Sequence, residues 1–124
     1  MALTRAQINA KISQLTREKN NYASERTKYK NSLTYARNLI KSLNNSSTYL
    51  VNSNDYMKRF FTINDKTADG GKINSTKDNI NQIIKKLNNT IIPSINNNIN
   101  NLNVKINNIE REINKLRREL QTAQ

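Results

Sequence analysis

The chain has 124 residues and a formal net charge of +12, with neither cysteine nor histidine. These counts exclude disulfides, thiolate chemistry and cysteine–histidine metal sites, and they remove the commonest general base. Hydrophobic residues make up only 35% of the chain, so its core must be thin, which fits long helices and not a compact α/β domain.

The first helix is predicted to begin at a capping box. Thr4 stands at the N-cap and Gln7 at N3, where their side chains satisfy backbone amides that have no partner within the helix. Leu3 and Ile8 flank this box at the spacing of a hydrophobic staple. The helix is therefore expected to start near residue 4.

From Ile8 onward, mostly apolar residues recur at alternating steps of four and three residues, and we call this row of residues the seam of the helix. This heptad spacing predicts one face of a long helix over residues 4–61. A kink at residues 44–47 is the alternative, because Asn and Ser favour caps and turns. The seam reads Ile8, Ile12, Leu15, Lys19, Tyr22, Arg26, Tyr29, Leu33, Ala36, Ile40, Leu43, Ser47, Leu50, Asn54, Met57 and Phe61. Its polar members are expected to set register and partner choice.

Residues 62–74 are predicted to form the connecting loop, since they include Gly70 and Gly71. A weaker capping box at Ser75 then predicts a second helix over residues 75–121. Two long helices joined by a loop predict an all-α fold, an antiparallel long helical hairpin that forms a single domain over residues 1–124.

The second helix carries a nearly pure isoleucine and leucine seam. It reads Ile80, Ile84, Leu87, Ile91, Ile95, Ile99, Leu102, Ile106, Ile109, Ile113, Leu116 and Leu120. Ile91, Ile95 and Ile99 follow one another at two successive steps of four, which is a stutter in the heptad. Pro93 lies inside the stutter and lacks the amide hydrogen of a regular helix, so a bend is expected there.

No candidate for catalysis stands out. Asp65 and Asp69 flank Lys66 without the pattern of a calcium loop, and Gly70-Gly71-Lys72 lacks the spacing and preceding strand of a phosphate-binding loop. A solvated turn explains both better. We expect no enzyme activity, no metal and no cofactor.

The positive charge raises the possibility of nucleic-acid binding, but the charges are scattered over both helices. A solvated basic surface is the favoured interpretation. No apolar run approaches the roughly 20 residues that span a bilayer, and the N-terminus has no apolar segment of a secretory signal.

The stretches from Phe61 to Lys72 and from Ile91 to Ile95 resemble small helical proteins of the Gram-positive type VII (Esx) secretion system. Within this group, the chain more closely resembles the YwqH-like, WXG-like proteins encoded beside LXG toxins. This chain departs from the family in having no Trp-x-Gly in the loop. The family's export motif places an acid four residues after Tyr or Phe, which Phe61 and Asp65 match within the loop.

The resemblance implies a targeting or chaperone partner that bundles with the N-terminal helical domain of an LXG toxin, or with a second small helical protein. It further implies a protein made in the cytoplasm and exported by the type VII route without a cleaved signal peptide. Two alternatives stay open: a basic nucleic-acid-binding accessory protein and a self-associating coiled-coil scaffold.

The second seam is less interrupted by polar residues than the first, so it is expected to keep apolar surface for a partner helix. The partner-binding residues predicted on this basis are Ile84, Ile91, Ile95, Ile99, Leu102, Ile106, Ile109 and Ile113.

Overall fold

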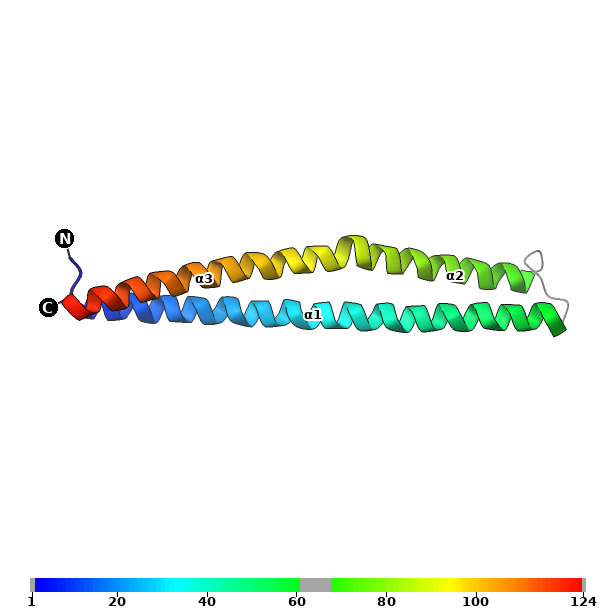
Figure 1. Cartoon of the computed structure of the whole chain (residues 1–124), viewed down its shortest axis with the longest axis horizontal. Coiled ribbons are helices and arrows are strands. Elements are labelled where there is room, and N and C mark those ends of the chain that lie inside the picture. Colours follow the sequence, from blue (N-terminus) through cyan, green and yellow to red (C-terminus); the bar gives the residue numbers. More distant parts are fainter. Residues whose placement is uncertain (1, 61–67, 124) are drawn as a thin grey trace. The chain divides into compact units, whose positions relative to one another are not determined.

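The computed structural model describes residues 2–60 and 68–123, and almost all of them are helical. Helix α1 spans Arg5–Phe60 and α2 spans Ala68–Lys86. A single π turn, Leu87–Ile91, joins α2 to α3, which spans Ile92–Thr122 (Figure 1). The described residues contain no strand. The prediction of an all-α helical hairpin is confirmed.

The start of α1 forms as the capping box predicts. The backbone amide of Thr4 donates to Gln7 Oε1 at 2.9 Å, and the amide of Gln7 donates to Thr4 Oγ1 at 3.2 Å. The amide of Ile8 then donates to the carbonyl of Thr4, which closes the first turn. Ile8 is the most buried side chain described, at 1% exposure, and Leu3 is half-buried. The helix thus begins one residue after its cap.

Helix α1 continues through residues 44–47 without a break. Asn44 and Ser47 are poor helix formers. The hydroxyl of Thr48 nevertheless donates at 3.0 Å to the carbonyl of Asn44, four residues back, which is the spacing of a helix. Ser47 lies half-buried on the seam. Packing along the seam therefore outweighs the local preference for a turn, as is usual for helices in proteins.

The second helical arm begins at Ala68, earlier than the expected Ser75. Residues 68–74 of the predicted loop are therefore helical, and residues 62–67 lie outside the described part. Ile73 and Lys77 are half-buried and continue the seam backward from Ile80 at steps of three and four. This added packing explains why the helix tolerates Gly70 and Gly71, although each glycine costs roughly 1 kcal/mol in a helix interior.

The irregularity expected around Pro93 takes the form of the π turn, which shows in Figure 1 as a wider loop of ribbon between α2 and α3. The amide of Ile92 donates to the carbonyl of Leu87, five residues back. A π turn holds one more residue than an α turn, and it therefore absorbs the extra residue of the stutter. It also ends two residues before Pro93, whose missing amide hydrogen interrupts the regular hydrogen-bond ladder.

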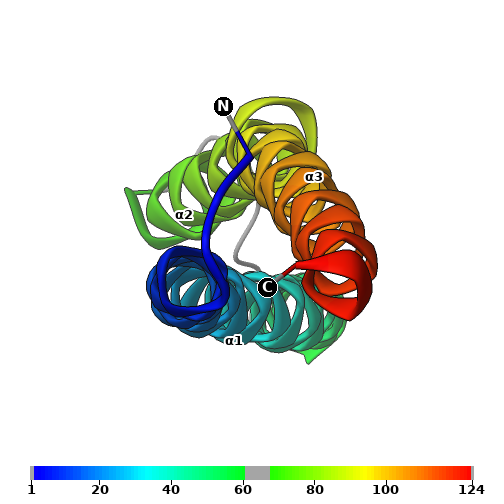
Figure 2. The ribbon, with the colours of Figure 1, turned by 90° about the vertical axis from the view of Figure 1, so that its left-hand side faces the viewer.

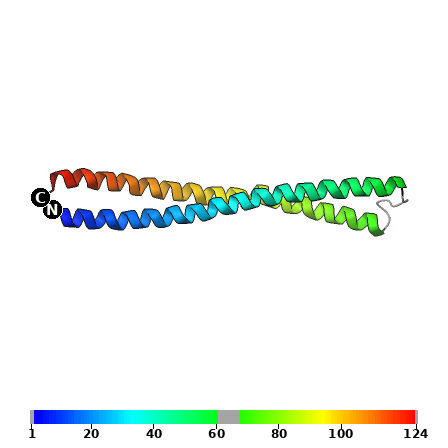
Figure 3. The same cartoon turned by 90° about the horizontal axis from the view of Figure 1, so that it is seen from below.

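The chain divides into two compact units. The terminal unit comprises Met1–Ser32 and Ile95–Gln124, and the central unit comprises Leu33–Ser94. In the terminal unit, the first half of α1 lies antiparallel beside α3, with the start of α1 and the end of α3 at the same end (Figures 2 and 3). In the central unit, the second half of α1 lies beside α2 (Figure 1).

Candidate partner-binding surface

The predicted partner-binding residues divide between the two units. Ile99, Leu102, Ile106, Ile109 and Ile113 are buried in the terminal unit, within the chain's own hairpin. Ile84 and Ile91 of the central unit and Ile95 of the terminal unit are half-buried. The first five residues can meet another chain only if α1 moves away from them. The remaining three keep part of their surface in the folded hairpin.

Long side chains on α1 reach α3 in the terminal unit, where the seam residues of α3 are buried. Arg26 Nη1 donates to Asn103 Oδ1 at 2.9 Å, and Lys105 Nζ lies 5.2 Å from the centre of the Tyr22 ring. Tyr22 also donates its hydroxyl to Glu18 Oε1 at 3.5 Å, in an exposed position. Arginine, lysine and tyrosine can bury the apolar part of the side chain while the polar end stays exposed to solvent. Positions that weaken the seam in the sequence thus help to cover the isoleucines of α3.

The central seam is covered less completely. Only Ala36 and Leu87 are buried among its described residues, and its other described members are half-buried. Here the short side chains of Ala36 and Ser47 alternate on α1 with larger seam residues that are all half-buried, namely Leu33, Ile40, Leu43 and Leu50. The central unit therefore keeps apolar surface along its seam.

Large exposed hydrophobic side chains follow the same division. Tyr35 and Tyr49 on α1 are each 72% exposed, and Ile83 on α2 is 47% exposed. All three belong to the central unit, whereas Val104, at 57%, belongs to the terminal unit. Neither tyrosine lies on the predicted seam. Their spacing of fourteen residues, two heptads, places them on one side of the helix and was a signal available in the sequence.

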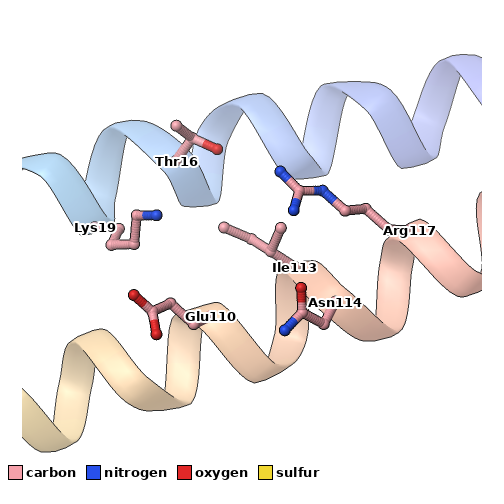
Figure 4. A pocket seen from close by; sticks show the side chains of 6 residues that line it. All are labelled: Thr16, Lys19, Glu110, Ile113, Asn114 and Arg117. Atoms are coloured by element: carbon pink, nitrogen blue, oxygen red, sulfur yellow. The ribbon is translucent and has the colours of Figure 1, made fainter.

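A groove of about 260 Å³ runs along one side of the terminal unit (Figure 4). Glu110 points toward Lys19 across it, and Arg117 reaches over toward α1. Its lining residues are Thr16, Lys19, Glu110, Ile113, Asn114 and Arg117. One carboxylate beside two cations and an amide offers no paired acid and base, so we assign no chemistry to this groove.

A second groove of about 220 Å³ is lined by Lys11, Gln14, Leu15, Glu112 and Leu116. The two grooves reveal how the helices pair. In heptad lettering, a seam residue followed by a step of three is an a position, and one followed by a step of four is a d position. Leu15, Ile109 and Leu116 are therefore d positions. The residues that directly follow them share one groove, and they are Thr16, Glu110 and Arg117. Lys11 and Glu112 each directly precede an a residue, and they share the other. Residues of type e thus lie together on one side of the antiparallel pair, and residues of type g on the other.

Other kinds of site find no support in the described part of the chain. No group of three acidic, cysteine or histidine residues gathers there as a metal site would need. No described helix is long and apolar enough to cross a membrane. The predicted export motif, Phe61 and Asp65, lies outside the described residues.

Comparison with known proteins returns no relative: no protein-family model, curated protein or solved structure matches the chain.

Proposed function

We propose that the protein is a non-enzymatic helical binding partner that forms a bundle with a helical segment of another chain. The observation that supports this function is the contrast in burial between the two units. The terminal unit buries six seam residues of α3, from Ile99 to Leu116, whereas only Ala36 and Leu87 are buried among the described seam residues of the central unit.

The terminal unit supplies the stability on which such binding depends. Its buried side chains are seven of the nine described as buried in the chain. Because a buried isoleucine or leucine contributes roughly 2 kcal/mol, this unit supplies most of the described apolar burial that stabilises the hairpin. Among the described residues of the central unit only Ala36 and Leu87 are buried, so burial of its remaining apolar surface is left to another helix.

The resemblance to small helical proteins of the type VII secretion system suggests the class of partner, the N-terminal helical domain of an LXG toxin. The targeting role and the export of the complex rest on this resemblance. An amphipathic helix that packs into a hairpin is a recurrent mode of recognition, and its specificity comes from apolar anchors one helical turn apart.

Size-exclusion chromatography of the chain mixed with such a domain, with light scattering to measure mass, tests the proposal. We expect a complex that persists in about 0.5 M salt, where the Debye length is only a few ångströms. Ile84→Asp in the central seam should abolish the complex while circular dichroism stays helical. Val104→Asp, an exposed residue of the terminal unit, is the matched control and should leave the complex intact.

The basic-surface alternative predicts the opposite pattern. Binding to duplex DNA falls steeply with added salt, because protein–phosphate contacts release counterions. If the chain binds duplex DNA in about 0.15 M salt and the Ile84→Asp variant binds it equally well, while no helical domain forms a complex, the proposal is refuted.

A further inference from the structure

The exposed hydrophobic residues of the central unit share one side of it. The grooves of the terminal unit establish that g positions of two antiparallel helices lie on the same side. In the central unit, Leu39 directly precedes Ile40, and Ile83 directly precedes Ile84, so both are g positions. Tyr35 lies one helical turn before Leu39, on the same side of α1.

Tyr49 belongs to this side as well, because it lies two heptads after Tyr35. We name the surface formed by Tyr35, Leu39, Tyr49 and Ile83 the tyrosine face. At 1.5 Å per residue, its two tyrosines lie about 21 Å apart along α1. That distance matches about four turns of a helix laid along the surface. Leu39 is half-buried and the other three residues are exposed.

The composition of the tyrosine face is that of an interface core. Residues 42–54 carry no charged side chain, although charged residues make up 24% of the chain. Protein interfaces are depleted in charge at their centre and enriched in tyrosine, which supplies contact area at a low cost in conformational entropy. The small residues Ser42 and Ser46 lie between the tyrosines on the same side and permit close approach of another backbone.

Among the side chains that the structure describes, the charges at the edge of the tyrosine face have one sign. Lys86 lies one turn after Ile83 on the same side of α2, and Lys72 lies two heptads before Lys86. Both lysines are exposed. Between residues 35 and 53 α1 has no acidic residue, and Asp78 of α2 directly follows an a position, which places it on the other side. The edge is therefore basic.

We infer that the tyrosine face is the docking surface for an amphipathic helix with an apolar stripe bordered by acidic residues. This inference rests on the proposed function and adds the site and the chemistry of the partner. Acidic borders complement Lys72 and Lys86, and the apolar stripe covers Tyr35, Tyr49 and Ile83. A second copy of the chain fits less well, since it brings another net charge of +12 and the same lysines to the contact.

Fluorescence anisotropy with synthetic peptides tests the inference on the full chain. The probe is a labelled 21-residue helix with Leu at a and d and Glu at e and g, whose glutamates repel and keep it from pairing with itself. Two control peptides are compared with it. The Lys peptide has Lys in place of every Glu, and the scrambled peptide has the composition of the Glu peptide in random order. We expect the Glu peptide to bind, and the scrambled and Lys peptides to bind at least tenfold more weakly.

Variants locate the binding. Tyr49→Ser combined with Ile83→Ser should weaken binding of the Glu peptide at least tenfold. Val104→Ser in the terminal unit should leave the affinity for this peptide unchanged. These three side chains are exposed, so the variants are expected to fold, which thermal unfolding checks. Equal weakening by Val104→Ser, or equal binding of the scrambled peptide, overturns the assignment of this face.

Two outcomes separate this inference from the proposed function. If the Lys peptide binds as tightly as the Glu peptide and depends equally on Ile83, the acidic partner is refuted and helix binding stands. If the chain alone is a dimer that Tyr49→Ser with Ile83→Ser converts to a monomer, the occupant is a second copy and the inference is refuted.

Discussion

Arg26 on α1 donates a hydrogen bond of 2.9 Å to the side-chain oxygen of Asn103 on α3, from a seam position that a leucine or isoleucine would otherwise fill. A polar residue at a single seam position commonly fixes register and oligomeric state at a cost in stability. This pair links residues 77 positions apart in the sequence. It fixes how α1 and α3 are aligned in the terminal unit.

Arg26→Leu is therefore expected to stabilise the terminal unit and to reduce the specificity with which α1 pairs with α3 rather than with other helices. Replacing a half-buried cation by an apolar side chain should raise the free energy of unfolding by about 1 kcal/mol. Light scattering should then detect oligomers that the native chain does not form. Asn103→Ala serves as the comparison, and it should lower stability by about 1 kcal/mol through loss of the hydrogen bond alone. A strictly monodisperse Arg26→Leu protein would contradict the role in specificity.

The two units are expected to respond differently to loss of a seam isoleucine. Ile106 is 5% exposed in the terminal unit, and Ile84 is half-buried in the central unit. Ile106→Ala should lower the free energy of unfolding by about 3 kcal/mol, within the range of buried isoleucine deletions, and Ile84→Ala by about 1 kcal/mol. Urea unfolding measures both. Native-state hydrogen exchange should also show slower exchange in the terminal unit.

Deletion of Pro93 is expected to be tolerated. Removing this residue changes the seam steps after Leu87 from three fours to four, three and four, which restores the heptad. It also removes the only proline, so the π turn should revert to α-helix. We expect an unchanged or higher melting temperature by circular dichroism.

The matched control is deletion of Asn107, an exposed residue of α3. That deletion rotates every later seam residue by about 100° away from α1 and should lower the melting temperature markedly. Similar melting temperatures for the two deletions would show that the heptad register does not govern this arm.

Arg5 is expected to hold the end of α3. Its Nη1 donates to the carbonyl of Leu120 at 3.2 Å and to that of Ala123 at 3.4 Å. The last carbonyls of a helix have no partner within it, and a cation beside them contributes about 0.3–1 kcal/mol. Arg5→Ala should therefore speed hydrogen exchange in the last turn of α3 by about two- to fivefold. Exchange at Ile106 should stay unchanged, which distinguishes local fraying from unfolding of the unit.

Local patterns in the sequence determined most of the fold. The capping box at Thr4 and Gln7 forms because its partners are three residues apart and need no tertiary contact. The seam periodicity predicted which face of each helix turns inward, because side-chain direction on a helix follows from spacing alone. The stutter at Ile91, Ile95 and Ile99 located the irregularity in the second arm.

Tertiary structure decided how deeply each part of that seam is buried. Ile84 and Ile106 look alike in the sequence, but burial depends on the side chains opposite, which spacing along one helix does not reveal. Arg26 and Tyr22 reach α3 in the terminal unit, where six seam residues of α3 are buried, whereas Ile80 and Ile84 on α2 are half-buried. The exposed side of the central unit, with Tyr49 and Ile83, emerges only when two helices are paired, because it is formed by residues on both of them.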